Sequence, residues 1–183
     1  METIRVTTWM DAPMERCFKL ATSIDLHLAS AAQTQEKAIG GVTSGLITEG
    51  QTVQWQGRHF GQLRTHTSKI DGWRPYSYFR EVMVEGSFAR FEHEHHFAVM
   101  DDGTRMRDEI RFSAPHGVLG KFMEKMVLRR HLIKMLRQRN VLIKRAAESE
   151  EWRKYLERTG TVTGGREAGL VNGWDKRSAL QRG

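Results

Sequence analysis

The sequence predicts an α+β domain in which a curved antiparallel sheet of six or seven strands wraps around one long C-terminal helix. Three observations indicate this class. Two short helical segments follow the first alternating run, short alternating runs separated by turn residues occupy residues 50–115, and an apolar stripe with helical spacing continues to about residue 157. The 183 residues suffice for one domain of about 150 residues and a tail. We therefore expect a domain over residues 1–158 and a Gly-rich, disordered tail over residues 159–183.

The N-terminal segment predicts one strand and two short helices. Residues 2–9 alternate between the two faces of a half-buried strand. Asp11 and Pro13 then mark a helix start, because an aspartate can cap free amide groups and a proline is tolerated in the first turn. Ser23 is placed to cap a second helix, which runs to about Ala32.

Residues 50–115 predict an antiparallel meander, preceded by a break at Gly40 and Gly41. The expected strands cover residues 51–56, 59–70, 76–85, 88–100 and 104–114. Asp102 and Gly103 give the strongest hairpin signal, because a two-residue type I′ turn needs positive φ at both central positions. A strongly curved sheet leaves space between itself and a covering helix, so this topology predicts a pocket.

A continuous helical pattern runs from about residue 115 to residue 157. Its apolar stripe consists of Phe122, Met126, Ile133, Leu136, Ile143 and Ala147. A helix of about 40 residues would be roughly 60 Å long. Because that length exceeds what the sheet can cover, we expect the end of the helix to project or bend.

The formal charge of +7 is concentrated in the same C-terminal region. Residues 1–117 hold 13 basic and 15 acidic side chains, whereas residues 118–158 hold 12 basic and 5 acidic ones. This basic helix is either a solvated face or a contact for an anionic membrane surface or another protein. The excess is not spread over a groove across the domain, which disfavours nucleic acid as a partner.

Composition and motifs exclude several other classes. The single cysteine, Cys17, rules out an internal disulfide and a multi-cysteine metal site, and its apolar neighbours favour a buried thiol. No run of about 20 apolar residues could span a bilayer, and residues 1–10 lack a secretory-signal pattern, so we expect a cytoplasmic protein. The sequence has neither a nucleotide-binding glycine motif nor a Gly-x-Ser-x-Gly elbow, and we expect no cofactor.

Four stretches of the sequence resemble a known superfamily: Asp11–Phe18, Val53–Gly61, Phe79–Phe88 and His93–Phe97. They are similar to the START-type, pollen-allergen-like proteins, often called SRPBCC, and to a bacterial branch loosely labelled cell-division-inhibitor-like. The resemblance covers residues 2–148 and implies the helix-grip fold. It also implies binding of lipids, sterols, polyketides or other apolar ligands, and some members are cyclases, hydroxylases or hydrolase activators. No catalytic residue is carried over to this chain, because none is universal in that branch.

Alternation in the strand at 88–100 places His93 and His95 on its more apolar face, toward the expected pocket. The predicted hairpin then puts Asp108 diagonal to His95 on the same face. A carboxylate near two imidazoles could line the pocket, act in acid/base catalysis or, with a third ligand, hold a metal. Glu81 joins this group only if a bulge shifts the register of its hairpin.

The expected ligand-binding residues combine this polar group with side chains of the sheet and the helix. They are Trp55, Phe91, His93, His95, Phe97, Asp108, Ile110, Phe112, Phe122, Met126, Arg129 and Ile133. Arg129 or its neighbour Arg130 either points inward, to pair with an anionic ligand head or a protein carboxylate, or lies along the surface with its head in water.

Three functions follow from these expectations. The first is a binding or carrier module for a lipid-, sterol- or polyketide-like molecule. The second is a cyclase or isomerase that uses His93, His95 and Asp108 as acid/base groups. The third is an interaction protein that docks through its basic C-terminal helix.

Overall fold

The elements follow the expected order, with one strand more than the six assigned to particular residues. A computed structural model describes residues 1–113 and 121–157, with side chains of the second stretch from Met126 onward. The elements are β1 (Glu2–Met10), α1 (Met14–Ala21), α2 (Ile24–Ser30), the 3-10 turn η1 (Ala32–Thr34), β2 (Lys37–Gly41), β3 (Thr52–His59), β4 (Gln62–Arg74), β5 (Tyr78–Glu85), β6 (Arg90–Met100), β7 (Gly103–Ser113), α3 (Lys121–Ala147) and α4 (Trp152–Leu156). The expected tail and the side chain of Phe122 lie outside the described residues.

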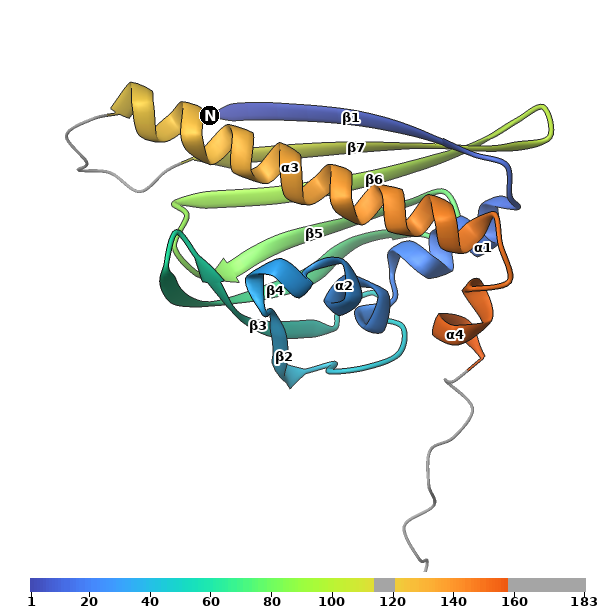
Figure 1. The fold of residues 1–183 in the computed structure, drawn as a ribbon, viewed down its shortest axis with the longest axis horizontal. Helices are drawn as coiled ribbons and strands as arrows, with labels where there is room; N and C mark the ends of the chain where they lie inside the picture. The colour runs from blue at the N-terminus through green and yellow to red at the C-terminus, as the bar shows by residue number, and fades with distance from the viewer. Residues whose placement is uncertain (114–120, 158–183) are drawn as a thin grey trace, which may run out of the picture.

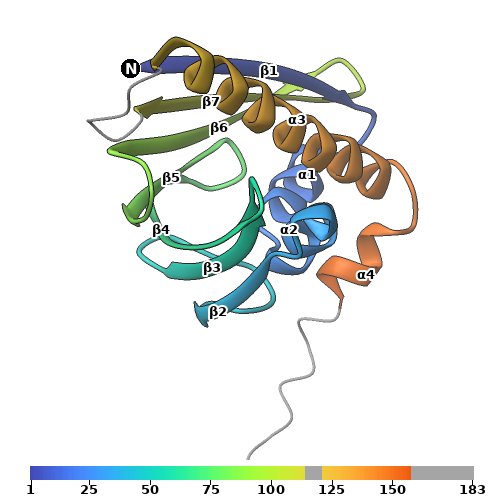
Figure 2. The same cartoon turned by 60° about the vertical axis from the view of Figure 1, so that its left-hand side comes forward.

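The seven strands form one antiparallel sheet in the order β1-β7-β6-β5-β4-β3-β2. The first strand therefore pairs with the last one, and the remaining strands follow as a meander. Figures 1 and 2 show the sheet curving away from β1, with α3 running along one side and α1 and α2 enclosed by the curve. Strand β4 contains two irregularities in its pairing with β5, which bend and twist the sheet at that point. The α+β class and the curved sheet around a C-terminal helix are confirmed.

Strand β2 is the one strand of the sheet to which the sequence assigned no residues. The expected break at Gly40 and Gly41 is instead the end of this edge strand, whose register shifts between Ala38 and Gly40. Gly41 has φ of 68°, and a Cβ atom there would come within 2.2 Å of the carbonyl oxygen of Thr52. Only glycine can therefore take this conformation so close to the neighbouring strand. The glycines permit the edge strand to form rather than ending the regular structure.

One of the two expected helix caps is present. The Ser23 hydroxyl accepts a hydrogen bond from the Leu26 amide at 3.3 Å, as predicted for the start of α2. Asp11 does not cap α1, whose N-cap is Pro13 without a side-chain hydrogen bond. The Asp11 amide instead donates to Glu148 Oε1 at 2.7 Å. This contact joins the β1–α1 connection to the end of α3.

The expected helix of about 40 residues is two helices, so its end bends. Helix α3 ends at Ala147, and the Ser149 hydroxyl accepts a hydrogen bond from the Glu151 amide at 3.2 Å in the connection to α4. Helix α4 packs against α1, with the Arg16 guanidinium 4.8 Å from the Trp152 ring centroid. Figure 1 shows α4 lying beyond the end of α3 rather than continuing its axis.

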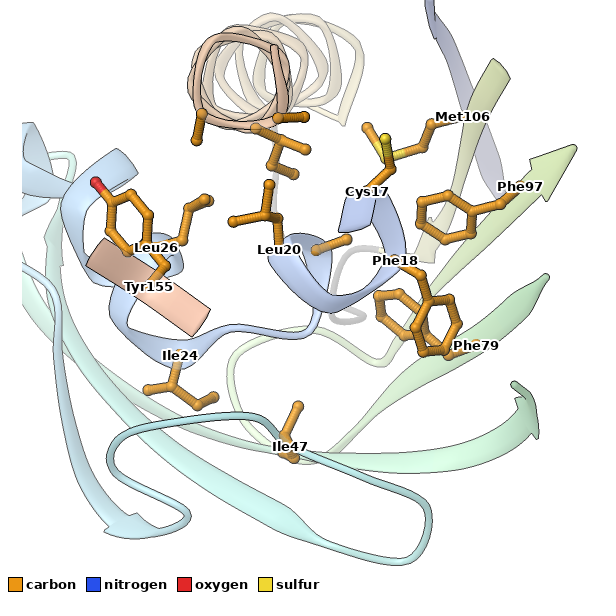
Figure 3. Close-up of a cluster of buried hydrophobic side chains, with 14 of the residues drawn as sticks. Cys17, Phe18, Leu20, Ile24, Leu26, Ile47, Phe79, Phe97, Met106 and Tyr155 are labelled. Carbon is orange, nitrogen blue, oxygen red and sulfur yellow. The ribbon is translucent and has the colours of Figure 1, made fainter. Parts of the chain in front are cut away.

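The buried apolar side chains form two clusters. The larger one surrounds α1 and brings together the far end of α3, α4 and the β5–β7 region; Figure 3 labels Cys17, Phe18, Leu20, Ile24, Leu26, Ile47, Phe79, Phe97, Met106 and Tyr155. The smaller one, between β1, β7 and the middle of α3, consists of Ile4, Ile110, Phe112 and Leu136. Half-buried Val6, Phe88, Phe91, Leu128, Leu132 and Ile133 surround the smaller cluster. The core is thus densely packed at the α1 end and less completely buried at the other.

Among the described residues, no helix is both long enough and apolar enough to cross a membrane.

Candidate functional site

A buried group of polar side chains lies on the inner face of β6 and β7. His93 and His95 are 5% and 1% exposed, and Asp108 is fully buried. Asp108 Oδ1 lies 2.7 Å from Nδ1 of His95 and 3.2 Å from Nε2 of His93. The alternation of the strand therefore predicts the inward direction of both histidines correctly, and one carboxylate contacts both rings.

The pairing of these residues differs from the expected hairpin. Met100 pairs with Gly103, so the central turn positions are Asp101 and Asp102, and Asp101 has φ of 39°. Because the turn is displaced by one residue, each residue of β6 pairs with a β7 residue two positions earlier than expected. Because side chains alternate with a period of two, their faces stay the same. Asp108 consequently lies directly opposite His95 rather than diagonal to it.

The second oxygen of Asp108 connects the sheet to α3. Asn140 Nδ2 donates to Asp108 Oδ2 at 2.7 Å and contacts Thr8 Oγ1 at 3.1 Å. Strands β1, β6 and β7 and helix α3 are therefore joined by one hydrogen-bonded group. A groove of about 420 Å³ between β1 and α3 is lined in part by Thr8 and Asn140, and so borders this group.

Glu81 extends the group onto β5. It pairs with His93 in the β5–β6 ladder, and the residues Gly86–Ala89 lie between the two strands. A two-residue turn at Gly86 and Ser87 would have placed it on the other face. A potential ligand atom from each of Glu81, His93 and His95 lies within 4.8 Å of the other two. The sequence predicted that Glu81 would join the group only if the register of its hairpin were shifted, and the register is shifted.

Burial and hydrogen bonding determine the charges of this group. Burial alone would raise the pKa of Asp108, but the hydrogen bond from His93 and the close approach of His95 hold it well below its ordinary value. Burial lowers the pKa of His95 to about 3. At neutral pH Asp108 is therefore an anion and His95 is uncharged. An uncharged His95 carries one N–H; its Nδ1 is the ring nitrogen that lies 2.7 Å from Asp108, and its Nε2 has no partner among the described residues.

Four buried polar atoms of this region have no hydrogen-bond partner among the described residues. They are Nδ1 and Nε2 of His95, Nε of Arg139 and Oδ1 of Asn140; the first of these lies 2.7 Å from Asp108 Oδ1 but without the geometry of a hydrogen bond. Buried polar atoms without partners are uncommon, because each one costs roughly 1–3 kcal/mol. Their concentration here distinguishes this region from an ordinary buried network.

The buried arginine of α3 is Arg139 and not Arg129. Arg129 and Arg130 are both exposed, as in the alternative in which their heads lie in water rather than the one in which either points inward. Arg139 is 9% exposed, and its Nη2 donates to the carbonyl oxygen of Ala21 at 2.6 Å. Its spacing from Leu136 and Ile143, three and four residues away, places it beside the buried stripe. That spacing is the signal for Arg139 in the sequence.

The remaining expected ligand-binding residues are distributed over different parts of the core. Phe97 belongs to the cluster around α1, whereas Ile110 and Phe112 belong to the smaller cluster. Met126, Ile133 and Phe91 are half-buried. Trp55 is buried and stacks on His27, with 4.2 Å between ring centroids. The structure thus separates these side chains into packing residues and half-buried residues.

A further set of histidines lies away from β6 and β7 and was not expected from the sequence. His27 Nε2 lies 3.2 Å from Oε2 of the buried Glu36, beside Trp55. His59 Nδ1 lies 3.2 Å from His131 Nε2. These contacts depend on the pairing of β3 with its neighbours and on the packing of α2 and α3, which residue spacing does not reveal.

Comparisons with known proteins identify the fold. No family model matches the chain, and no curated protein matches it. Among solved structures it is similar to TTHA0849 from Thermus thermophilus, with 16% identity and a TM-score of 0.63 over 80% of this chain and all of the other. It is also similar to the Zhui aromatase/cyclase from Streptomyces sp. R1128, with 14% identity and a TM-score of 0.61 over 81% of this chain and 97% of the other. A third similar structure is that of major latex-like protein 151 from Panax ginseng, with 12% identity and a TM-score of 0.58 over 80% of this chain and 97% of the other.

These similarities establish the helix-grip fold that the sequence resemblance implied. The identities are low, so the comparisons concern the fold alone. Membership of the bacterial cell-division-inhibitor-like branch stays a prediction.

Proposed function

We propose that this protein binds a small, mainly apolar molecule carrying at least one polar group, between α3 and the inner face of the sheet. The observation that carries this proposal is the position of half-buried apolar side chains next to buried polar atoms without partners. An apolar ligand would cover the first, and its polar group would satisfy the second.

The apolar part of the proposed site is the set of half-buried residues around the smaller cluster. Leu132 and Leu128 are four and eight residues before the buried Leu136, and therefore lie on the same face of α3. Phe91 pairs with the buried Phe112 across the β6–β7 ladder. Removing such side chains from water on ligand binding is favourable by about 25 cal/mol per Å² of apolar area.

The polar part is the region of His95, Arg139 and Asn140. A ligand hydroxyl or carbonyl oxygen has the right chemistry to donate to or accept from the free atoms of these side chains. One structural neighbour is an aromatase/cyclase. That activity belongs to the neighbour, and for this protein it supports only a search for ligands among aromatic and polyketide-like compounds.

A cyclase or isomerase reaction with His95 as the base has less support. A general base works best with a pKa near the operating pH. The pKa of His95, lowered to about 3 by burial, makes it a weak base at neutral pH. Such a mechanism would need ligand binding to change the surroundings of His95.

Docking through the end of the basic helix also has less support. Beyond Ala147 the chain turns back, and Arg145 Nε bonds to Glu151 Oε1 at 3.0 Å while Arg153 Nε bonds to Glu150 Oε2 at 2.6 Å. Part of the positive charge is thus paired within the chain. Salt-sensitive binding to anionic vesicles, lost when residues after Ala147 are removed, would restore this alternative.

Native mass spectrometry of freshly purified protein tests the proposed function. We expect an adduct of a few hundred daltons that disappears on denaturation. The Leu132→Trp variant should reduce its occupancy, because the larger side chain fills the proposed site from α3. Val127→Trp, at a position 46% exposed on the same helix, is the matched control and should retain the adduct. A protein that stays free of adducts and binds no member of a lipid, sterol and polyketide panel would contradict the proposal.

A further inference from the structure

Three potential metal ligands converge on the inner face of β5 and β6. Glu81 and His93 are opposite each other in the ladder, and His95 is two residues further along the same face of β6. One ligand atom from each lies within 4.8 Å of the other two. The His93 and His95 rings are adjacent, with centroids 3.8 Å apart. No ligand or partner is needed to bring these groups together, because the pairing of two neighbouring strands does so.

Asp108 orients both histidines from behind. It contacts Nε2 of His93 and Nδ1 of His95 with the same oxygen. Each ring then has its other nitrogen, Nδ1 of His93 and Nε2 of His95, turned away from the carboxylate. A carboxylate that fixes the tautomer and direction of a histidine is the common second partner of a metal-ligating imidazole.

His95 supplies an independent indication of a ligand. The residue is 1% exposed, and its Nε2 makes no hydrogen bond within the described part of the chain. A polar ring nitrogen in that position is costly to bury without a partner. A metal ion would satisfy it together with Glu81 and His93.

We propose that Glu81, His93 and His95 bind one divalent transition-metal ion, either zinc or iron(II), with Asp108 as their orienting partner. Two imidazoles and one carboxylate are a known ligand set for both ions, and they leave coordination positions open for water or a ligand oxygen. The negative charges of Glu81 and Asp108 offset the charge of the ion. Metal–ligand bonds of about 2.1 Å require ligand atoms roughly 3.4 Å apart in a tetrahedral site, so small side-chain rotations complete the site.

The competing location for a metal is the pair of His59 and His131. Their facing nitrogens are 3.2 Å apart, and the pair lies outside the buried group. It provides two ligands, whereas the proposed site provides three. Any test must therefore separate the two places by substitution.

The test uses full-length, untagged protein purified without chelator. The protein is dialysed against zinc, and separately against iron(II) without oxygen, and the bound metal is measured by elemental analysis. We expect one equivalent of one of these ions that survives dialysis. Glu81→Gln, which keeps the size of the side chain, and His95→Ala should each weaken binding at least tenfold. His59→Ala and His96→Ala should retain the metal, because His96 lies on the opposite face of β6 beside Glu94.

Circular dichroism and a thermal unfolding curve establish that each variant is folded before its metal content is compared. Addition of the ion should raise the unfolding temperature of the wild type and of His59→Ala but not of Glu81→Gln, because an ion that binds only the folded state stabilises it. Absence of bound metal in the wild type would overturn the proposal. Loss of the metal on His59→Ala, with retention in Glu81→Gln and His95→Ala, would also overturn it. Neither result depends on whether an organic ligand is found.

Discussion

Asp108 lies directly across the β6–β7 ladder from His95, with 2.7 Å between Oδ1 and Nδ1. The same carboxylate contacts His93 and accepts a hydrogen bond from Asn140. Two histidines of β6 and one amide of α3 therefore depend on a single buried anion. Any ligand or metal at this place meets side chains whose orientations are fixed in advance.

Asp108→Ala should destabilise the protein by about 3–5 kcal/mol, because it removes the partner of three buried polar groups at once. Asp108→Asn keeps one accepting oxygen and the volume, so its effect should be smaller. Urea unfolding followed by fluorescence measures both. Asp102→Ala, in the exposed β6–β7 turn, is the control and should change stability by less than about 0.5 kcal/mol. A loss below about 1 kcal/mol for Asp108→Ala would mean that the network contributes little.

Alternation along β6 was sufficient to predict which face His93 and His95 occupy, but not which residues they meet. The cross-strand partner of a residue depends on the exact position of the turn. Moving the β6–β7 turn by one residue preserved the faces and brought Asp108 opposite His95. A one-residue offset of the β5–β6 register, relative to a two-residue turn at Gly86 and Ser87, changed the face of Glu81. Faces follow from a period of two, whereas partners require the geometry of each connection.

The C-terminal helix illustrates a second limit. Apolar spacing predicted the buried positions of Leu136 and Ile143, yet the inward arginine is Arg139 and not Arg129. Arginines occur on nearly every face of this helix, and the packing of α3 against α1 determines which of them is buried. The length of the helix predicted that its end would project or bend, but not that the bend falls after Ala147, because residues on both sides of it are good helix formers.

Arg139→Met should destabilise the protein by roughly 1–3 kcal/mol. The substitution keeps much of the apolar stem but removes the hydrogen bond to the Ala21 carbonyl oxygen, which is then buried without that donor. It also removes a positive charge that, against the opposing effect of burial, helps to lower the pKa of Glu81. Arg137→Met, two residues earlier and exposed, should be nearly neutral. Equal unfolding midpoints for the two variants would contradict a structural role of Arg139.

Cys17 should react with a thiol reagent such as DTNB only when the protein unfolds. The residue is fully buried, and burial raises the pKa of its thiol, so the reactive thiolate is both rare and inaccessible. We expect slow labelling of the native protein and fast labelling in denaturant, followed by absorbance. A second cysteine introduced at the exposed Ser87 provides the control and should be labelled at once. Fast labelling of native wild-type protein would show that the α1 region opens readily.

The free energy of unfolding should depend on pH because Glu109 is bonded to two arginines on the outer face of the sheet. Arg5 Nε bonds to Glu109 Oε2 at 2.8 Å, and Arg111 Nη2 bonds to Oε1 at 2.6 Å. The hydrogen bond from Arg5, supported by Arg111 and opposed by burial, lowers the pKa of Glu109 to about 2 from its ordinary value of 4.5. Because the folded-state pKa is the lower one, this stabilisation is present above pH 4.5 and is lost as the pH falls toward 2.

Since the Arg5 side chain is 66% exposed, solvent screening should reduce the contribution to about 1 kcal/mol. Urea midpoints should be measured from about pH 6 to about pH 2.5, which covers the ordinary pKa of Glu109 and most of the range down to its lowered value. As the pH falls, the midpoint should decrease less steeply for Glu109→Gln than for the wild type. Glu49→Gln, at an exposed position, should follow the wild-type slope. Parallel slopes for wild type and Glu109→Gln would mean that the arginines stabilise the unfolded chain as much as the folded one. Added salt should shrink the difference, because the partners are solvent-exposed, whereas the buried contacts of Asp108 should respond much less.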